Sequence, residues 1–90
     1  MMNMKKITYF YLASCPHCIR ANKLIDEIIA EDPKYAAVVF DRIEESQQMS
    51  VAKTYDYWYV PCFFIGKEKL MEGVPSKEKI KAAMDAALSE

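Results

Sequence analysis

The segment Cys15-Pro16-His17-Cys18 has the clearest chemical content in this sequence. A thiolate that attacks a disulfide forms a mixed disulfide, and a second thiol close by can then release the product. Two cysteines separated by two residues suit this exchange, because the second sulfur comes within reach of the first. The spacing therefore predicts thiol–disulfide exchange through a redox-active pair.

The predicted position of this segment, between a strand and a helix, distinguishes the two thiols. The unpaired N–H groups of a helix's first turn stabilise a thiolate, so Cys15 is predicted to be the nucleophile. Cys18 lies one turn further in, at the start of the apolar face, and is predicted to be the more buried, resolving thiol. Pro16 fixes the turn.

His17 can add positive charge beside the Cys15 sulfur, which would stabilise the reduced form and make the disulfide a better oxidant. We therefore expect a reduction potential less negative than about −270 mV, the value for thioredoxin. The alternative is that His17 is a solvated side chain with little influence.

A CxxC pair can instead supply half of a structural zinc site. Zinc needs two more ligands, and the sequence offers only Cys62 and its single histidine, His17, inside the motif itself. No metal site is therefore expected. Cys62 is interpreted as a buried small hydrophobe. A third redox thiol, or an iron–sulfur or soft-metal ligand acting with Cys15, remain the alternatives.

Hydrophobic patterning predicts the elements that position these thiols. Residues 6–12 are β-branched and aromatic and indicate a buried strand. From Pro16 the apolar residues, beginning with Ile19, fall largely on one face of an amphipathic helix that ends near Ala30. The later elements are a strand over 36–41 buried on both faces, a short helix within 45–56, a hairpin of strands over 60–65 and 68–72 that turns at Gly66, and a final helix N-capped by Ser76.

The order of these elements is β-α-β-α-β-β-α. A βαβ unit with parallel strands, followed by an antiparallel hairpin, predicts an α/β fold with a mixed four-stranded sheet flanked by three helices. The chain has 90 residues, of which 52% are hydrophobic. This is enough for one core, so residues 1–90 are expected to form a single domain.

The charge and hydropathy of the chain limit which partners it can bind and where in the cell it is expected. Twelve basic and thirteen acidic residues give a formal net charge of −1, which argues against a nucleic-acid ligand. No apolar run approaches the roughly 20 residues that cross a bilayer. The segment Leu12-Ala13-Ser14-Cys15 looks like a lipoprotein cleavage box, but the preceding stretch is short and aromatic for a signal core. We expect a cytoplasmic monomer that binds neither nucleic acid nor membranes.

The whole pattern resembles the thioredoxin superfamily, in the compact form typical of glutaredoxins and small thioredoxin-like proteins. The resemblance rests on the CPxC motif between strand and helix, and on Val60-Pro61 before an apolar strand, and it covers essentially the whole chain. It implies a thiol–disulfide oxidoreductase with a cis peptide bond before Pro61, across from the CxxC motif. It also implies that the backbone of Val60 binds an extended substrate.

Four aromatic residues precede this proline: Tyr55, Tyr57, Trp58 and Tyr59. Because they lie close to the predicted substrate-binding segment, they could form an apolar rim for a disulfide substrate. The alternative is that one or two of them complete the core. On the first interpretation, Trp58 and Tyr59 join Val60 and Pro61 as substrate-binding residues.

Departures from the glutaredoxin pattern affect the expected substrate. Glutaredoxins bind glutathione with a lysine before the first cysteine, a Thr-Val-Pro segment and a Gly-Gly-x-Asp turn. Here residues 11–14 lack the lysine, Tyr59 replaces the threonine, and residues 72–75 lack the second glycine and the aspartate. The acid that thioredoxins bury on their first strand is also missing around Tyr9. We expect protein or small-molecule disulfides as substrates, an unidentified reductant and no resident cofactor, with glutathione left open as a co-substrate.

Overall fold

The computed structural model describes residues 5–89 and confirms the predicted order of elements. A short 3-10 helix, η1, is added after the first helix. The elements are β1 (Ile7–Tyr11), α1 (Pro16–Glu31), η1 (Pro33–Ala37), β2 (Phe40–Glu44), α2 (Met49–Ala52), β3 (Cys62–Ile65), β4 (Glu68–Glu72) and α3 (Lys77–Leu88).

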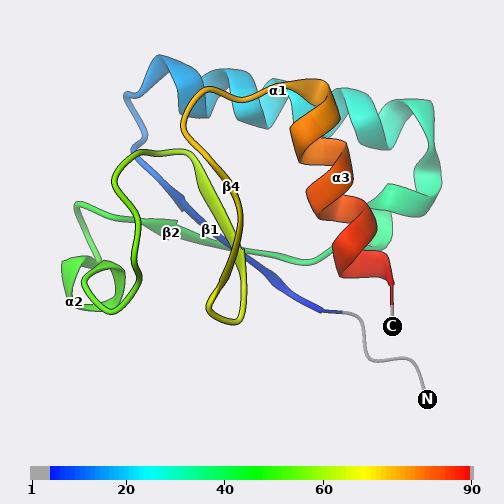
Figure 1. The fold of residues 1–90 in the computed structure, drawn as a ribbon. Coiled ribbons are helices and arrows are strands. Elements are labelled where there is room, and N and C mark those ends of the chain that lie inside the picture. The colour runs from blue at the N-terminus through cyan, green and yellow to red at the C-terminus, as the bar shows by residue number, and fades with distance from the viewer. Residues whose placement is uncertain (1–4, 90) are drawn as a thin grey trace.

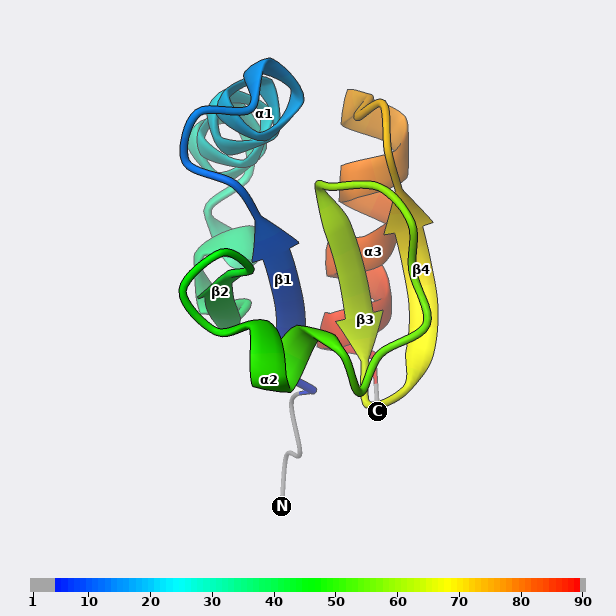
Figure 2. The same cartoon turned by 90° about the vertical axis from the view of Figure 1, so that its left-hand side faces the viewer.

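The four strands form one mixed sheet in the order β2-β1-β3-β4. Strand β1 runs parallel to β2 and antiparallel to β3, and β4 closes the hairpin with β3. Helices α1 and α3 cover one face of this sheet, and α2 lies on the other side (Figures 1 and 2). The predicted α/β fold, with a mixed four-stranded sheet flanked by three helices, is therefore confirmed.

Alternation along β1 builds a separate hydrophobic cluster on each face. Ile7 and Tyr9 point into the larger cluster beneath α1 and α3, whereas Phe10 points into the smaller one. The smaller cluster has four buried members and is covered by α2 and the segment that follows it: Phe10, Ile43, Cys62 and Phe64, against Val51, Ala52, Tyr55, Tyr57 and Val60. Two long helices thus cover one face of the sheet, and a short helix together with aromatic side chains covers the other.

Helix α1 follows the predicted bounds to within one residue, but its buried face differs at one position. Ile19 was expected on the apolar face and is 53% exposed, so this expectation is wrong. The buried stripe instead consists of Cys18, Ala21, Leu24, Ile25 and Ile28. Successive helical residues are about 100° apart, so a stripe that begins at Cys18 turns Ile19 towards solvent.

The second strand begins later than predicted. The apolar run 36–41 was interpreted as a strand buried on both faces, but residues 33–37 form η1 and β2 starts at Phe40. The Asp32 carboxylate accepts a hydrogen bond from the Lys34 N–H at 3.3 Å, and Pro33 opens the turn, so local capping delays the strand. Strand β2 lies at an edge of the sheet, and Val39 just before it is 54% exposed.

The remaining local predictions hold with two changes of length, the first being that the strand expected over 60–65 begins only at Cys62. The helix expected within 45–56 has only four residues, because side-chain and backbone bonds from Ser46 to Glu44 hold the preceding residues in a turn. Gly66 turns the hairpin with a φ of 58°, and the Ser76 hydroxyl caps α3 by accepting from the Lys79 N–H at 3.1 Å. Across residues 5–89, no helix has both the length and the apolar character needed to cross a membrane.

Candidate active site

Cys15 lies at the N-cap of α1, where the strand-to-helix junction was predicted. Its backbone is extended, and its carbonyl accepts hydrogen bonds from the N–H groups of Cys18 and Ile19, both at 3.0 Å. No side chain in the described residues caps this helix, so the first-turn N–H groups keep their partial positive charge. The partly exposed Cys15 sulfur is therefore next to a site that favours an anion.

Cys18 is only 1% exposed, as expected for the more buried thiol of the pair. The pKa of Cys18 is raised from 9.0 to about 12, mainly by burial and also by the neighbouring Cys15 side chain, while a backbone hydrogen bond from Leu12 opposes the shift. Cys18 is therefore a neutral thiol at neutral pH. The pair combines one accessible sulfur with one that is shielded from solvent.

Tyr9 lies beneath the pair on β1, at the strand where the sequence lacks a buried acid. Its hydroxyl donates to Asn22 Oδ1 at 2.8 Å and lies 3.3 Å from the carbonyl oxygen of Cys18. Arg42 also donates to Asn22 Oδ1 at 2.8 Å. Desolvation of the hydroxyl, followed by the nearby Cys18, raises the pKa of Tyr9, so it stays neutral and fixes the start of α1 by hydrogen bonding.

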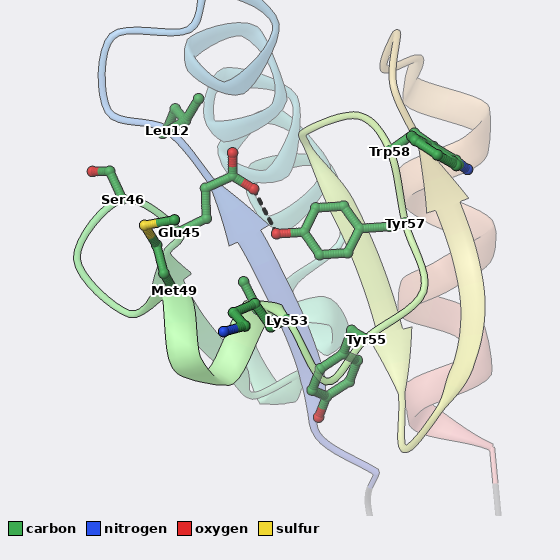
Figure 3. A pocket seen from close by; sticks show the side chains of 9 residues that line it. Leu12, Glu45, Ser46, Met49, Lys53, Tyr55, Tyr57 and Trp58 are labelled. Atoms are coloured by element: carbon green, nitrogen blue, oxygen red, sulfur yellow. Dashed lines mark hydrogen bonds between the residues drawn. The ribbon is translucent and has the colours of Figure 1, made fainter.

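An acidic side chain does approach Cys18, but from another element. Glu45 directly follows β2, and its backbone N–H donates to the carbonyl of Tyr11 at 3.0 Å. Its carboxylate accepts from the Tyr57 hydroxyl at 2.5 Å and contributes a negative charge that raises the pKa of Cys18 (Figure 3). The sequence analysis missed Glu45, because only the tertiary fold brings the end of β2 beside the CxxC segment.

The peptide bond between Val60 and Pro61 is cis, which confirms that prediction. Cys62 pairs with Phe10 near the end of β1, so this segment lies at the same end of the sheet as Cys15. A cavity of about 520 Å³ lies beside it and brings three of the predicted site residues together. Its lining is His17, Tyr59 and Val60, with Glu72, Gly73, Val74 and Lys79.

Of the four aromatic residues before Pro61, two complete the core and two are exposed, so each of the two interpretations applies to one pair. Tyr55 and Tyr57 pack against Phe10, with ring centroids 4.8 and 4.9 Å away, and so complete the smaller cluster. Trp58 is 84% exposed and Tyr59 is 69% exposed, which fits an apolar rim. Trp58 and Tyr59 line different cavities. The cavity that Trp58 lines has a volume of about 440 Å³ (Figure 3). Its other lining residues are Leu12, Glu45, Ser46, Met49, Ala52, Lys53, Tyr55 and Tyr57.

Cys62 is completely buried in the smaller cluster, among Phe10, Ile43 and Phe64. Burial raises the pKa of Cys62 from 9.0 to about 12, and the negative charge of Glu72 adds to this. These surroundings fit the interpretation of Cys62 as a small hydrophobe. Among the residues that the structure describes, no three histidine, cysteine or acidic side chains group in a way that could hold a metal ion.

The arrangement defines a class of protein. A mixed sheet, a CxxC segment at the start of α1 and a cis-proline at the same end of the sheet are the features of a thioredoxin fold. The sequence profile of the family described as "Thioredoxin domain" matches residues 5–85. The chain belongs to this family.

Individual relatives agree with the family assignment. A curated thioredoxin from Methanocaldococcus jannaschii is 30% identical over 87 residues, which cover 97% of this chain and 100% of that protein. A mutant thioredoxin from Halobacterium salinarum has a similar structure, with a TM-score of 0.69 at 16% identity over 98% of this chain and 78% of that one. The oxidised thioredoxin of Plasmodium falciparum gives 0.70 at 16% identity, over 97% and 84%.

The similar structures and the similar sequences support different conclusions. The two solved structures support the fold alone, because their sequence identity to this chain is low. The family match and the archaeal relative extend over nearly the whole chain, and they support thiol–disulfide oxidoreductase as the class of activity.

Proposed function

We propose that this protein is a thiol–disulfide oxidoreductase that cycles Cys15 and Cys18 between dithiol and disulfide while acting on protein or small-molecule disulfides. The observation that carries this proposal is the contrast within the pair. Cys15 is accessible at the uncapped N-terminus of α1, whereas Cys18 is 1% exposed beside it. An accessible nucleophile next to a shielded second thiol is what a two-step exchange requires.

In the first step, the Cys15 thiolate attacks one sulfur of a substrate disulfide. A bond forms between Cys15 and that sulfur, the substrate disulfide breaks, and the other substrate sulfur departs and takes up a proton. The N–H groups of the first turn of α1 stabilise the attacking thiolate, and Pro16 sets the helix start at which they are exposed. His17 lines the cavity beside the cis-proline, and its proposed role is to tune the neighbouring Cys15 sulfur.

In the second step, Cys18 loses its proton and attacks the Cys15 sulfur. The second substrate sulfur leaves with a proton, and Cys15 and Cys18 form a disulfide, so the substrate gains two electrons and the protein loses two. An external thiol reductant restores the dithiol. Because burial raises the pKa of Cys18 to about 12, this thiol stays unreactive until the mixed disulfide is next to it.

Substrate binding is assigned to the segment before the cis-proline. Tyr59 and Val60 line the cavity shared with His17, and the backbone of Val60 is placed to pair with an extended chain that carries the disulfide. Of the other two residues predicted to bind substrate, Trp58 is exposed but lines the other cavity, and Pro61 is buried, so Pro61 supports this surface without forming part of it. No cofactor is needed, glutathione is a candidate co-substrate, and a cytoplasmic monomer fits the proposal. The comparisons do not favour the alternative of an iron–sulfur or soft-metal carrier.

The test is to trap the mixed disulfide. The Cys18→Ser variant, incubated with insulin or with a peptide disulfide of glutathione, should accumulate a covalent adduct on Cys15 that mass spectrometry detects and dithiothreitol removes. Comparing the two substrates decides between protein and glutathione disulfides. The double variant with Cys15→Ser is the matched control, and an adduct of equal yield in that variant would contradict the assignment of the nucleophile.

A further inference from the structure

Glu72, the last residue of β4, makes an unusual set of contacts for a side chain at a strand end. One carboxylate oxygen, Oε2, accepts hydrogen bonds from two consecutive backbone N–H groups, those of Trp58 and Tyr59, the latter at 2.9 Å. The other oxygen, Oε1, accepts from Lys69 Nζ at 2.9 Å. Both oxygens are thus engaged. These bonds lower the pKa of Glu72 to about 2, so the carboxylate is charged throughout the neutral range.

The residue after Glu72 fastens the same segment at a second place. The Gly73 N–H donates to the carbonyl oxygen of Pro61 at 2.9 Å. Gly73 has a φ of +82°, and a Cβ at this position would lie 3.8 Å from the Cβ of Tyr59, so the backbone at 73 runs close against the segment. Two consecutive residues at the end of β4 therefore hold three backbone groups between positions 58 and 61.

The backbone of Val60 lies between these fastened groups. Within residues 5–89, no hydrogen bond outside the regular elements engages the Val60 N–H or carbonyl. Val60 also lines the cavity next to His17, and Tyr59 and Glu72 line the same cavity. Among the described residues, the Val60 N–H is therefore the one backbone donor between positions 58 and 61 that has no partner, and the Val60 carbonyl is also free to accept.

We propose that Glu72 is a positioning residue that holds the Trp58–Pro61 segment in the conformation in which the Val60 backbone binds an extended disulfide-bearing peptide. This inference rests on the proposed function, because it deepens the account of the same site. Glu72 acts through the backbone it anchors, since both of its oxygens are already occupied. Peptide substrates that use the Val60 backbone should depend on it, and a small disulfide that reaches only Cys15 should not.

An ordinary surface ion pair between Glu72 and Lys69 would be the simpler explanation. Such pairs contribute little, and their loss affects all substrates alike. The two backbone bonds separate the explanations, because charge-assisted hydrogen bonds to backbone N–H groups are stronger than exposed ion pairs and fix a geometry. A variant that removes only the ion pair, Lys69→Met, isolates its contribution.

The experiment compares kcat and KM for insulin with those for the uncharged small disulfide of mercaptoethanol. Glu72→Ala should raise KM for insulin about tenfold and Glu72→Gln, which keeps one acceptor oxygen, about threefold. Turnover of the small disulfide should stay within about twofold of the wild type in both variants. The controls are Glu68→Gln, at the exposed start of the same strand, and Lys69→Met, each expected within about twofold for both substrates. An equal loss for both substrates, or an unchanged KM for insulin, would overturn the inference.

A second readout does not depend on activity. Amide hydrogen exchange followed by NMR should show the Trp58 and Tyr59 amides exchanging at least about tenfold faster in Glu72→Gln than in the wild type, while amides in α3 are unchanged. Unchanged protection of both amides would refute the anchoring role. If the wild type neither reduces insulin nor forms an adduct, the proposed function fails, whereas this measurement still decides whether Glu72 holds the segment.

Discussion

The start of α1 and the start of β3 each contain a buried thiol, and the two can be compared directly. Cys18 is 1% exposed and Cys62 is 0% exposed, and burial raises the pKa of each to about 12. Their neighbours differ. The Cys15 side chain is close enough to Cys18 to raise its pKa, whereas Cys62 lies among the apolar side chains of the smaller cluster.

This contrast shows that burial and weak acidity do not by themselves identify a redox thiol. Both properties suit a resolving cysteine, because a buried, protonated thiol does not react until a mixed disulfide forms next to it. The same properties suit an inert core residue. The deciding difference is the accessible sulfur beside Cys18, so experiments that remove or test this neighbour are the ones that sharpen the comparison.

The largest effect should come from the thiols themselves. Cys15→Ser should lower the rate of insulin reduction by at least about 100-fold, because a hydroxyl is not ionised at neutral pH and cannot form the mixed disulfide. Cys62→Ala should leave the rate within about twofold of the wild type. The measurement is turnover in an insulin assay with dithiothreitol as reductant. A comparable loss in Cys62→Ala, with the fold intact by circular dichroism, would make Cys62 a third redox thiol.

A smaller effect concerns stability at high pH, where both buried thiols should contribute. Each has a folded pKa raised from 9.0 to about 12, so its stabilising effect is complete below pH 9 and is lost as the pH rises towards 12. Over that window, each thiol lowers the free energy of unfolding by up to about 1.4 kcal/mol per pH unit. Urea unfolding of the wild type between pH 8 and pH 10 measures this slope, because above pH 10 the raised pKa values of Tyr9, Tyr35 and Tyr57 add to it.

Cys62→Ala is the variant that resolves the contribution of one thiol. It should lose about 1 kcal/mol at pH 7, because it removes a buried sulfur from a packed cluster, and its stability should fall less steeply above pH 9. Cys62→Val, which refills the site with a slightly larger apolar side chain that does not ionise, is the second variant. An unaltered slope in both variants would mean that Cys62 does not titrate with the fold.

The smallest effect should come from Glu45. Its negative charge is the last of the causes that raise the pKa of Cys18, after burial and the Cys15 side chain. Glu45→Gln should therefore lower the pKa of Cys18 slightly, and by less than Cys15→Ser does. The pH dependence of the Cys18 Cβ resonance measures both changes. The control is Glu44→Gln, because the Glu44 carboxylate accepts hydrogen bonds from the N–H groups of Ala13 and Ser46 instead. An equal shift in the pKa of Cys18 in this control would exclude a specific role for Glu45.

The sequence is sufficient to predict features that depend on local chemistry. The CxxC segment at a helix start, the turn at Gly66 and the cap at Ser76 follow from what those residue types do to their own neighbourhood. The late start of β2 also has a local cause, the cap at Asp32, but it was not predicted because the apolar run 36–41 is itself typical of a strand.

Other features could not be predicted from local patterns. Glu45 approaches Cys18 only because β2 pairs with β1, and Glu72 accepts from the N–H groups of Trp58 and Tyr59, which lie 14 and 13 positions earlier in the chain. Neither acid differs in its sequence context from the exposed carboxylates elsewhere. Their roles arise from the order of strands in the sheet, which joins the ends of β2 and β4 to the same site.

The order of the strands also lowers the tendency of the protein to aggregate through its uncharged central strands. The central strands β1 and β3 read ITYFY and CFFI, and such short uncharged segments stack readily into fibrils when their edges are free. In this sheet they are enclosed by β2 and β4, which carry acidic and basic residues along their length: Asp41, Arg42 and Glu44 on one side, and Glu68, Lys69 and Glu72 on the other. Charged outer strands discourage pairing between sheets of neighbouring molecules. The arrangement that supplies Glu45 and Glu72 to the site therefore also guards the folded protein against aggregation.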